Sequence, residues 1–161
     1  MSARFAQRPG ETRLDALPPH ADGVVFIGHI RSPWTLGDAP KNLRQARERG
    51  IAARLEIAAP FRPGLEGVSP GDGLILLYWT AAAPRDLIRQ HPRHRDTPTG
   101  TFALRSPARP NPIALGVVRC LSVDVATGIV GIDATDAIDG TPLLDIKPHI
   151  PAVDTLPPAP A

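Results

Sequence analysis

Twenty prolines spread along a chain of 161 residues restrict what this sequence can fold into more than any other feature. Proline interrupts the interior of a helix and removes a hydrogen-bond donor from a central strand. The prolines follow no collagen period and do not gather in one low-complexity block. Helical bundles and coiled coils are therefore excluded, and short elements separated by turns are expected.

The apolar residues between the prolines follow the patterns of strands. Residues 53–57 alternate with period two, and residues 74–79 form an apolar run after the turn signal at 69–73. Other strands are expected at residues 24–27, 113–123, 123–125, 129–132 and 143–146, with a hairpin turn at 126–128. Helices are expected only at 40–49 and, for one or two turns, at 84–90. We therefore predict an all-β fold, a small closed or nearly closed β-barrel with one or two short helices; a β-sandwich is the alternative.

Length and composition suggest one folded domain with two polar ends. Residues 1–22 are expected to form an N-terminal extension, residues 23–154 the domain, and residues 155–161 a tail of proline and alanine. The single cysteine, Cys120, excludes an internal disulfide and a cysteine-rich zinc site, and we expect it in the core. No apolar run has the length of a membrane span and no signal peptide is evident, so we expect a cytoplasmic protein.

Positive charge is concentrated in one part of the chain. The whole sequence carries 18 basic and 16 acidic residues, a net charge of +2. Between residues 85 and 109 only two aspartates oppose six arginines, which are Arg85, Arg89, Arg93, Arg95, Arg105 and Arg109. Such a patch attracts phosphates, although an arginine-rich surface in contact with water alone is an equally good interpretation.

Two segments have an unusual composition for connections. The first segment is Thr99–Ile113, in which Ser106, Arg109 and Asn111 are each followed by a proline. Because proline restricts its own backbone and that of the residue before it, the loop is expected to be stiff and to hold Arg105 and Arg109 in position to bind an anion. A rigid crossover that maintains strand register is the alternative. The second segment, residues 136–148, has a turn at Asp139–Pro142 and then an apolar strand that contains Asp145 and Lys147. Asp145 needs a partner there, either Lys147 or an arginine of the first segment.

Three motifs together resemble a known family. IGHIRSP at residues 27–33, RSPARPNPIAL at 105–115 and DGTPLLDIKP at 139–148 are similar to the TrmO/TsaA-like methyltransferases, over roughly residues 23–154. The resemblance implies a small β-barrel that binds S-adenosylmethionine and forms a homodimer. It also implies methylation of N6 of threonylcarbamoyladenosine, the modified base next to the anticodon of threonine tRNAs.

The resemblance further implies which residues bind the cofactor, and the charge pattern of residues 85–109 suggests which bind RNA. Cofactor contacts are expected from Arg105 and Leu115, from Asp139, Gly140, Thr141 and Pro142, from Tyr78 and Trp79, and from Pro40, Lys41 and Asn42. The last two groups depart from the commoner His-Gln and Pro-Arg-Gln of relatives. Contacts with the tRNA anticodon loop are expected from Arg85, Arg89, Arg93, Arg95 and Arg109. We expect the second, C-terminal domain of many relatives to be absent, which leaves tRNA recognition to the basic segment and the dimer partner.

The expected reaction needs no metal, and we expect none. His91 and His94 flank a proline and an arginine, so they are interpreted as part of an exposed basic loop rather than as metal ligands. The acceptor nitrogen needs a base, and the sequence does not choose among the candidates. These are a backbone carbonyl, the carboxylate of the substrate, and the side chains of Asp136, Asp139, Asp145, His91 and His94. Trp34 and Phe61 are candidates for stacking on an unpaired base, although ordinary packing is the commoner role of such residues.

A second function class is compatible with the same residues. A barrel of this kind that senses S-adenosylmethionine or binds RNA without transferring a methyl group has the same binding motifs, because a fold carries a binding site more reliably than a reaction. Methyl transfer to tRNA distinguishes the two hypotheses.

Overall fold

The computed structural model describes residues 8–13 and 23–158. The chain divides into two compact units. We call residues 25–78 and 115–161 the barrel unit, and residues 1–24 and 79–114 the loop unit. Parts of the expected N-terminal extension and tail, residues 1–7, 14–22 and 159–161, lie outside the described residues. The expected domain boundaries at residues 22 and 154 stay predictions.

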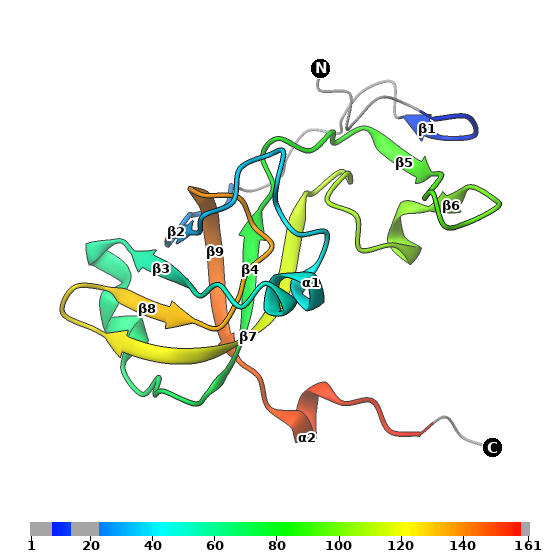
Figure 1. Ribbon diagram of the computed structural model, residues 1–161. Coiled ribbons are helices and arrows are strands. Elements are labelled where there is room, and N and C mark those ends of the chain that lie inside the picture. Colours follow the sequence, from blue (N-terminus) through cyan, green and yellow to red (C-terminus); the bar gives the residue numbers. More distant parts are fainter. Residues whose placement is uncertain (1–7, 14–22, 159–161) are drawn as a thin grey trace. The chain divides into compact units, whose positions relative to one another are not determined.

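Six strands build the barrel unit and close in the order β2-β3-β8-β7-β4-β9 (Figure 1). Their bounds are β2 (Gly28–Arg31), β3 (Ala53–Ile57), β4 (Gly73–Trp79), β7 (Ile113–Asp124), β8 (Ile129–Ile132) and β9 (Thr141–Pro148). β2 pairs with β3 and β9, β3 with β8, β4 with β9, and β7 with β8, each antiparallel. The predicted all-β barrel is confirmed.

Alternation along the strands places an aliphatic core inside the barrel. Leu74, Leu76 and Tyr78 of β4 are 2%, 1% and 5% exposed, whereas the residues between them are half-buried. The same alternation buries Ile30, Leu55, Val130, Ile132 and Leu143 completely. Cys120 of β7 also belongs to this core, and burial raises the pKa of its thiol. Each buried branched aliphatic side chain stabilises the fold by roughly 1.5–3 kcal/mol, so the core holds the barrel together.

The hairpin between β7 and β8 forms where the sequence predicts it. The amides of Ala126 and Thr127 donate to the Asp124 carboxylate, and the amide of Gly128 donates to the Asp124 carbonyl. Hydrogen bonds from Thr127, first by its side chain and then by its backbone, lower the pKa of Asp124. Gly128 has φ +76°, a left-handed conformation that glycine adopts without strain.

Two of the expected elements are wrong. Residues 24–27 form no strand; β2 begins at Gly28, and Val24 and Val25 are 55% and 65% exposed despite their β-branched side chains. The helix expected at 84–90 is instead strand β5 (Leu87–Gln90), because its backbone pairs with two other segments of the loop unit.

The helices of the barrel unit are short. α1 (Leu43–Glu48) lies inside the expected 40–49 range, and α2 (Pro151–Asp154) is a single turn. A 3₁₀ segment, η2 (Ala59–Leu65), was not expected from the sequence. Pro60 is its second residue and Pro63 lies inside it, and a proline cannot donate the backbone hydrogen bond that a helix needs at an interior position.

The loop unit contains a small sheet with the order β1-β5-β6. β1 (Thr12–Arg13) and β6 (Thr99–Gly100) each pair antiparallel with β5, and a 3₁₀ turn, η3 (Thr101–Ala103), follows β6. The two residues of β1 lie within the segment expected to be an extension. Within the described residues no helix is long and apolar enough to cross a membrane.

Candidate functional site

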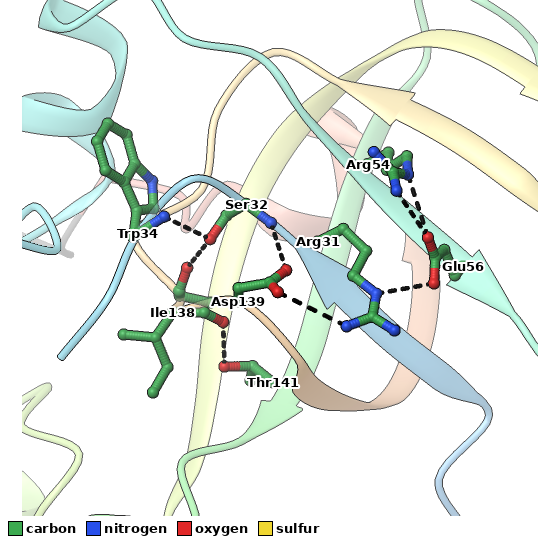
Figure 2. A network of polar contacts seen from close by, with 9 residues as sticks. Arg31, Ser32, Trp34, Arg54, Glu56, Ile138, Asp139 and Thr141 are labelled. Atoms are coloured by element: carbon green, nitrogen blue, oxygen red, sulfur yellow. Dashed lines mark hydrogen bonds and ion pairs between the residues drawn. The ribbon is translucent and has the colours of Figure 1, made fainter.

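The turn at residues 139–142, which we call the Asp139 turn, is held by the segment that follows β2. The amide of Asp139 donates to the Trp34 carbonyl and the amide of Gly140 to the Ile30 carbonyl, both over 2.9 Å. In return, the amide of Ser32 donates to Asp139 Oδ1 over 3.1 Å (Figure 2). Two of these bonds, Gly140 to Ile30 and Ser32 to Asp139, join the motifs at residues 27–33 and 139–148 in one place.

The backbone of the Asp139 turn uses its own donors. Gly140 has φ +75°, and the amide and hydroxyl of Thr141 both donate to the Ile138 carbonyl, over 3.2 and 2.7 Å. Because the amides of Asp139, Gly140 and Thr141 all have acceptors within the protein, the turn is no nest for an anion. The turn instead offers a hydrogen-bond acceptor to a ligand, because the carboxylate of Asp139 is 53% exposed.

An ion-pair cluster lies beside the turn. Arg31 Nε donates to Glu56 Oε2 over 2.8 Å, and Arg54 Nη2 donates to Glu56 Oε1 over 2.9 Å. Arg31 Nη1 also lies 3.7 Å from Asp139 Oδ2 (Figure 2). The hydrogen bond and the charge of Glu56 raise the pKa of Arg31, and the hydrogen bonds from Arg31 and Arg54 lower the pKa of Glu56. Arg31 therefore stays cationic next to the exposed carboxylate of Asp139.

Ser32 and Trp34 support the residues that precede the turn. The Ser32 hydroxyl donates to the Ala137 carbonyl over 2.7 Å, and Trp34 Nε1 donates to the Thr135 carbonyl over the same distance. Trp34 is 6% exposed, with the Arg49 guanidinium 4.9 Å from the centre of its ring. Of the two roles considered for Trp34, packing is therefore the one observed, and stacking on an RNA base is excluded because the ring is used in the fold. Phe61, 38% exposed, stays a candidate.

Tyr78 and Trp79 do not present their side chains to the same face. The Tyr78 hydroxyl donates to Asp136 Oδ1 over 2.7 Å, and the ring is buried. Trp79 follows it in the strand, is half-buried, and has the Arg85 guanidinium 5.3 Å from its ring centre. Adjacent strand residues point to opposite faces, so one binding surface takes at most one of these two side chains.

Pro40, Lys41 and Asn42 form the start of helix α1. The Asn42 side chain accepts from the amide of Gln45 over 3.0 Å, and Gln45 Oε1 accepts from the amide of Lys41 over 3.0 Å. Pro40 is buried, whereas Lys41 and Asn42 are exposed. The structure thus gives Asn42 a capping role that accounts for its residue type without a ligand.

Helix α1 brings Leu43 to strand β7 at a glycine. A Cβ atom on Gly116 would lie 3.2 Å from Leu43 Cδ1 and 3.6 Å from Tyr78 Cε1. Gly116 and Leu43 were not among the predicted site residues, although a glycine inside a strand signals close approach of another group. Leu115, the preceding residue, points outward and is 41% exposed. Within the barrel unit, Tyr78 and the start of α1 are therefore neighbours.

The proline-rich segment of the loop unit is fixed by side chains that donate to backbone carbonyls. Arg109 Nη2 donates to the carbonyls of Thr101 and Leu104, over 3.0 and 2.9 Å. Arg85 Nε donates to the Pro110 carbonyl over 2.7 Å, and Gln90 Nε2 to the Ala108 carbonyl over 2.6 Å. The stiffness predicted from the prolines is thus reinforced by these hydrogen bonds.

The arginines of the loop unit differ in their surroundings. Arg85 and Arg109 donate to backbone and are half-buried, whereas Arg89, Arg93, Arg95 and Arg105 are exposed. Arg95 Nη1 also lies 3.3 Å from Thr99 Oγ1. RNA contact by these residues stays a prediction. The prediction that Arg105 and the Asp139 turn bind the same cofactor also stays a prediction, because the two belong to different units.

Each carboxylate proposed as a base has a partner. Asp136 accepts from the Tyr78 phenol, Asp139 from the Ser32 amide, and Asp145 Oδ2 lies 2.7 Å from Lys147 Nζ. Of the two partners considered for Asp145, Lys147 is the one observed. Both ring nitrogens of His91 face backbone carbonyls, those of Pro9 and Arg95. Across the described part of the chain, no three histidine, cysteine or acidic side chains are grouped so as to hold a metal ion.

Comparison with known proteins places these motifs in a family. The profile of the tRNA-methyltransferase O N-terminal domain matches residues 29–155. A probable S-adenosyl-L-methionine-binding protein, VirR of Rhizobium radiobacter, is 42% identical over 135 residues, which cover 83% of this chain and 74% of that protein. An S-adenosyl-L-methionine-binding protein of Archaeoglobus fulgidus is 37% identical over 80% of this chain and 89% of its own length.

Proteins with the name of the methyltransferase are similar over less of their own length. The crystal structure of TrmO from Pseudomonas aeruginosa matches with a TM-score of 0.67 and 31% identity, over 88% of this chain and 61% of that one. The tRNA (adenine(37)-N6)-methyltransferase of Eikenella corrodens is 43% identical over 61 residues, or 37% of this chain and 35% of that protein. The chain thus spans about three fifths of the solved TrmO chain.

Proposed function

The chain belongs to the tRNA-methyltransferase O N-terminal domain family, and from this we propose that it methylates tRNA with S-adenosylmethionine as donor. The acceptor we propose is N6 of threonylcarbamoyladenosine, next to the anticodon of threonine tRNA. The observation that carries the proposal is the match over residues 29–155, which includes the Asp139 turn and the proline-rich segment.

The donor and acceptor groups of the proposed cofactor residues fit S-adenosylmethionine. The exposed carboxylate of Asp139, oriented by the Ser32 amide, is an acceptor of the kind that ribose hydroxyls and an ammonium group require. Arg105 supplies the cation that a carboxylate of the ligand requires. Relatives named as S-adenosyl-L-methionine-binding proteins, in Rhizobium radiobacter and Archaeoglobus fulgidus, support this assignment.

For methyl transfer, the main task of the protein is to position the methyl donor and the acceptor nitrogen. When bound, S-adenosylmethionine supplies an electrophilic methyl group: the bond from N6 to carbon forms as the carbon–sulfur bond breaks, its electron pair stays on sulfur, and the N6 proton leaves to a base. The residues of this chain orient the reactants, and orientation alone supplies several kcal/mol, roughly 7–11 at best. Fixed loops such as the Asp139 turn and residues 99–113 suit that task, because little entropy is lost when they bind.

A binding protein without transferase activity is the second candidate. It is favoured by the names of the relatives that this chain matches over most of their length, which refer to cofactor binding alone. The partners and location that the resemblance implies, a homodimer that binds the tRNA anticodon loop in the cytoplasm, belong to the first candidate and are part of that proposal. Light scattering of the purified protein measures the dimer directly.

Label transfer distinguishes the two candidates. The protein is incubated with methyl-labelled S-adenosylmethionine and tRNA from cells that lack the modification, and label in threonine tRNA is measured. Calorimetric binding of the cofactor is measured in parallel. We expect transfer by the wild-type protein, and tight cofactor binding without label in any tRNA contradicts the first candidate.

A matched pair of variants tests the Asp139 turn. Asp139→Asn removes the charge but keeps an acceptor for the Ser32 amide, and we expect cofactor affinity to fall about tenfold because one charge-assisted contact is weakened. Asp72→Asn is the control, since Asp72 is another exposed turn aspartate that accepts a backbone amide, that of Ser69. Equal affinities of the two variants exclude Asp139 from the cofactor site.

A further inference from the structure

Among the described residues, Phe102 is the most exposed aromatic side chain, with an accessible fraction of 82%. It lies in the middle of the three-residue turn η3 (Thr101–Ala103) in the proline-rich segment. Its predecessor Thr101 is 1% exposed, so the chain buries a threonine and leaves a phenyl ring in water. Apolar burial stabilises a fold, and this ring contributes little of it, so the ring is available for contact with a partner.

The backbone on both sides of Phe102 is fixed. Arg109 Nη2 donates to the carbonyls of Thr101 and Leu104, which are the residues immediately before and shortly after the ring. The Thr101 hydroxyl donates to the Leu87 carbonyl over 2.8 Å and accepts from Gln90 Nε2 over 3.0 Å. Phe102 is therefore presented by a rigid turn, and it has little backbone freedom to lose when a partner binds.

Exposed arginines accompany this turn. Arg89 pairs in register with Gly100, two residues before Phe102, and Arg95 donates to Thr99. Arg105 is exposed three residues after Phe102. Residues 79–114 as a whole carry six arginines and two aspartates, so the segment that carries the ring is cationic.

The isolation of the ring indicates the chemistry of its partner. Within residues 79–114 the other exposed large apolar side chain is Ile113, at 36%, so this segment by itself presents no broad apolar patch of the kind that binds another protein. A lone aromatic among arginines is the combination that binds single-stranded nucleic acid, in which bases stack on the ring and phosphates contact the cations.

We propose that Phe102 stacks on an unpaired base of single-stranded RNA, while Arg89 and Arg95 contact the flanking phosphates. This deepens the proposed function, on which the identity of the RNA rests, by naming the residue that recognises the unpaired region. The stacking itself needs neither the cofactor nor methyl transfer, so it can be tested separately.

The test uses the full chain without cofactor and an RNA stem-loop of anticodon-arm size that carries 2-aminopurine in its loop. Fluorescence quenching reports stacking, and affinity is measured over a series of KCl concentrations. The variants are Phe102→Ala and Phe102→Trp, with Leu156→Ala as control, because Leu156 is an equally exposed apolar residue, 88%, in the barrel unit.

We expect Phe102→Ala to lose the quenching and to bind about tenfold more weakly, as for removal of one base–aromatic stack. The slope of log affinity against log salt should not change, because no charge is removed; Arg89→Ala, in contrast, should reduce that slope by about 0.7. Phe102→Trp should restore both quenching and affinity, and Leu156→Ala should behave as the wild type.

Three results overturn the proposal: wild-type affinity of Phe102→Ala, an equal loss of affinity for a fully paired duplex of the same sequence, or a lower mass of Phe102→Ala in light scattering. The last assigns the ring to a contact between copies of the chain. Failure of the proposed function gives a different result from failure of this proposal. The wild-type protein would then bind the RNA and quench the 2-aminopurine fluorescence through Phe102, but it would transfer no label from S-adenosylmethionine.

Discussion

The barrel unit and the loop unit are stabilised by different kinds of contact. In the barrel unit the buried side chains are mainly branched aliphatics, such as Leu55, Ile132 and Leu143, all 0% exposed. Apart from Leu87, the buried side chains of the loop unit are small or polar, among them Ala83, Ala108, Gln90 and Thr101. The stability of the barrel unit therefore depends mainly on an apolar core. The irregular backbone of the loop unit is held in its conformation mainly by hydrogen bonds.

The two units also place their charges differently. The barrel unit has nine basic and eleven acidic residues. Some of its arginines form ion pairs, as Arg31 and Arg54 do with Glu56 and Arg47 does with Asp133, whereas Arg49, Arg62 and Arg119 donate to carbonyls. In the loop unit, Arg109 donates to neutral carbonyls. Bonds to carbonyls hold an arginine in place without cancelling its charge. A protein can in this way build a rigid surface that stays cationic.

The largest expected effect is in the core of the barrel unit. Leu55→Ala should lower the free energy of unfolding by about 3 kcal/mol, because it removes buried methyl groups and leaves a cavity. Urea unfolding followed by circular dichroism measures the loss. Leu121→Ala is the control, at 49% exposure on β7, with an expected change within about 0.5 kcal/mol. Equal losses for both variants would show that the core does not dominate.

In the loop unit, a polar residue should have the corresponding role. Gln90→Ala leaves the Ala108 carbonyl and the Thr101 hydroxyl without their donor, at a cost of about 2 kcal/mol. Hydrogen exchange should show lost protection in residues 87–104 and unchanged protection in β3 and β8. Gln45→Ala, at the exposed start of α1, is the control. An equal loss of protection in β3 would show that the hydrogen bonds of Gln90 also stabilise the barrel unit, contrary to the comparison.

Asn42 tests whether a predicted ligand residue of the barrel unit has a structural role alone. Asn42→Ala should cost about 1 kcal/mol because α1 loses its N-cap, and Asn42→Ser should cost little because serine caps as well. Thermal unfolding and calorimetric binding of S-adenosylmethionine measure stability and affinity for both variants. If Asn42→Ser keeps the stability but loses the affinity, Asn42 contacts the cofactor directly.

The smallest expected effect concerns the ion pairs of the barrel unit. Hydrogen bonds from Arg31 and Arg54 lower the pKa of Glu56, so its contribution to stability is present above the unfolded value, about 4.3, and is lost as the pH falls through the folded value. The unfolding temperatures of the wild type and Glu56→Gln should therefore differ at neutral pH and converge in acid. Glu48→Gln, in an exposed pair with Arg44, is the control. A difference that grows on acidification would contradict the assignment.

Apart from β2, which the expected strand at 24–27 missed, the strands of the barrel were predictable because their patterns are local. Residues 53–57 alternate as one buried and one outward face require, and 129–132 follows a turn whose Asp124 and Gly128 act within a few residues of each other. The motif residues at 139–142 were also recognisable without coordinates. Their function as a turn was predicted from the aspartate and glycine, and Gly140 indeed has positive φ.

What the sequence did not show depends on distant partners. Residues 87–90 form a strand because Thr12 and Arg13 pair with them, and nothing in the local pattern indicates that pairing. The burial of Trp34 follows from the Thr135 carbonyl, about a hundred positions along the chain. The acceptor character of the Asp139 turn likewise depends on the carbonyls of Ile30 and Trp34, which take up its amides.

Cys120 provides a way to observe how the barrel opens. It is the single cysteine of the sequence, it is 1% exposed on β7, and burial disfavours its reactive thiolate form. A thiol reagent can modify the protein only when β7 separates from its neighbours. The labelling rate of the wild-type protein therefore reports how often the barrel opens locally at β7. A ligand that contacts several strands would lower that rate.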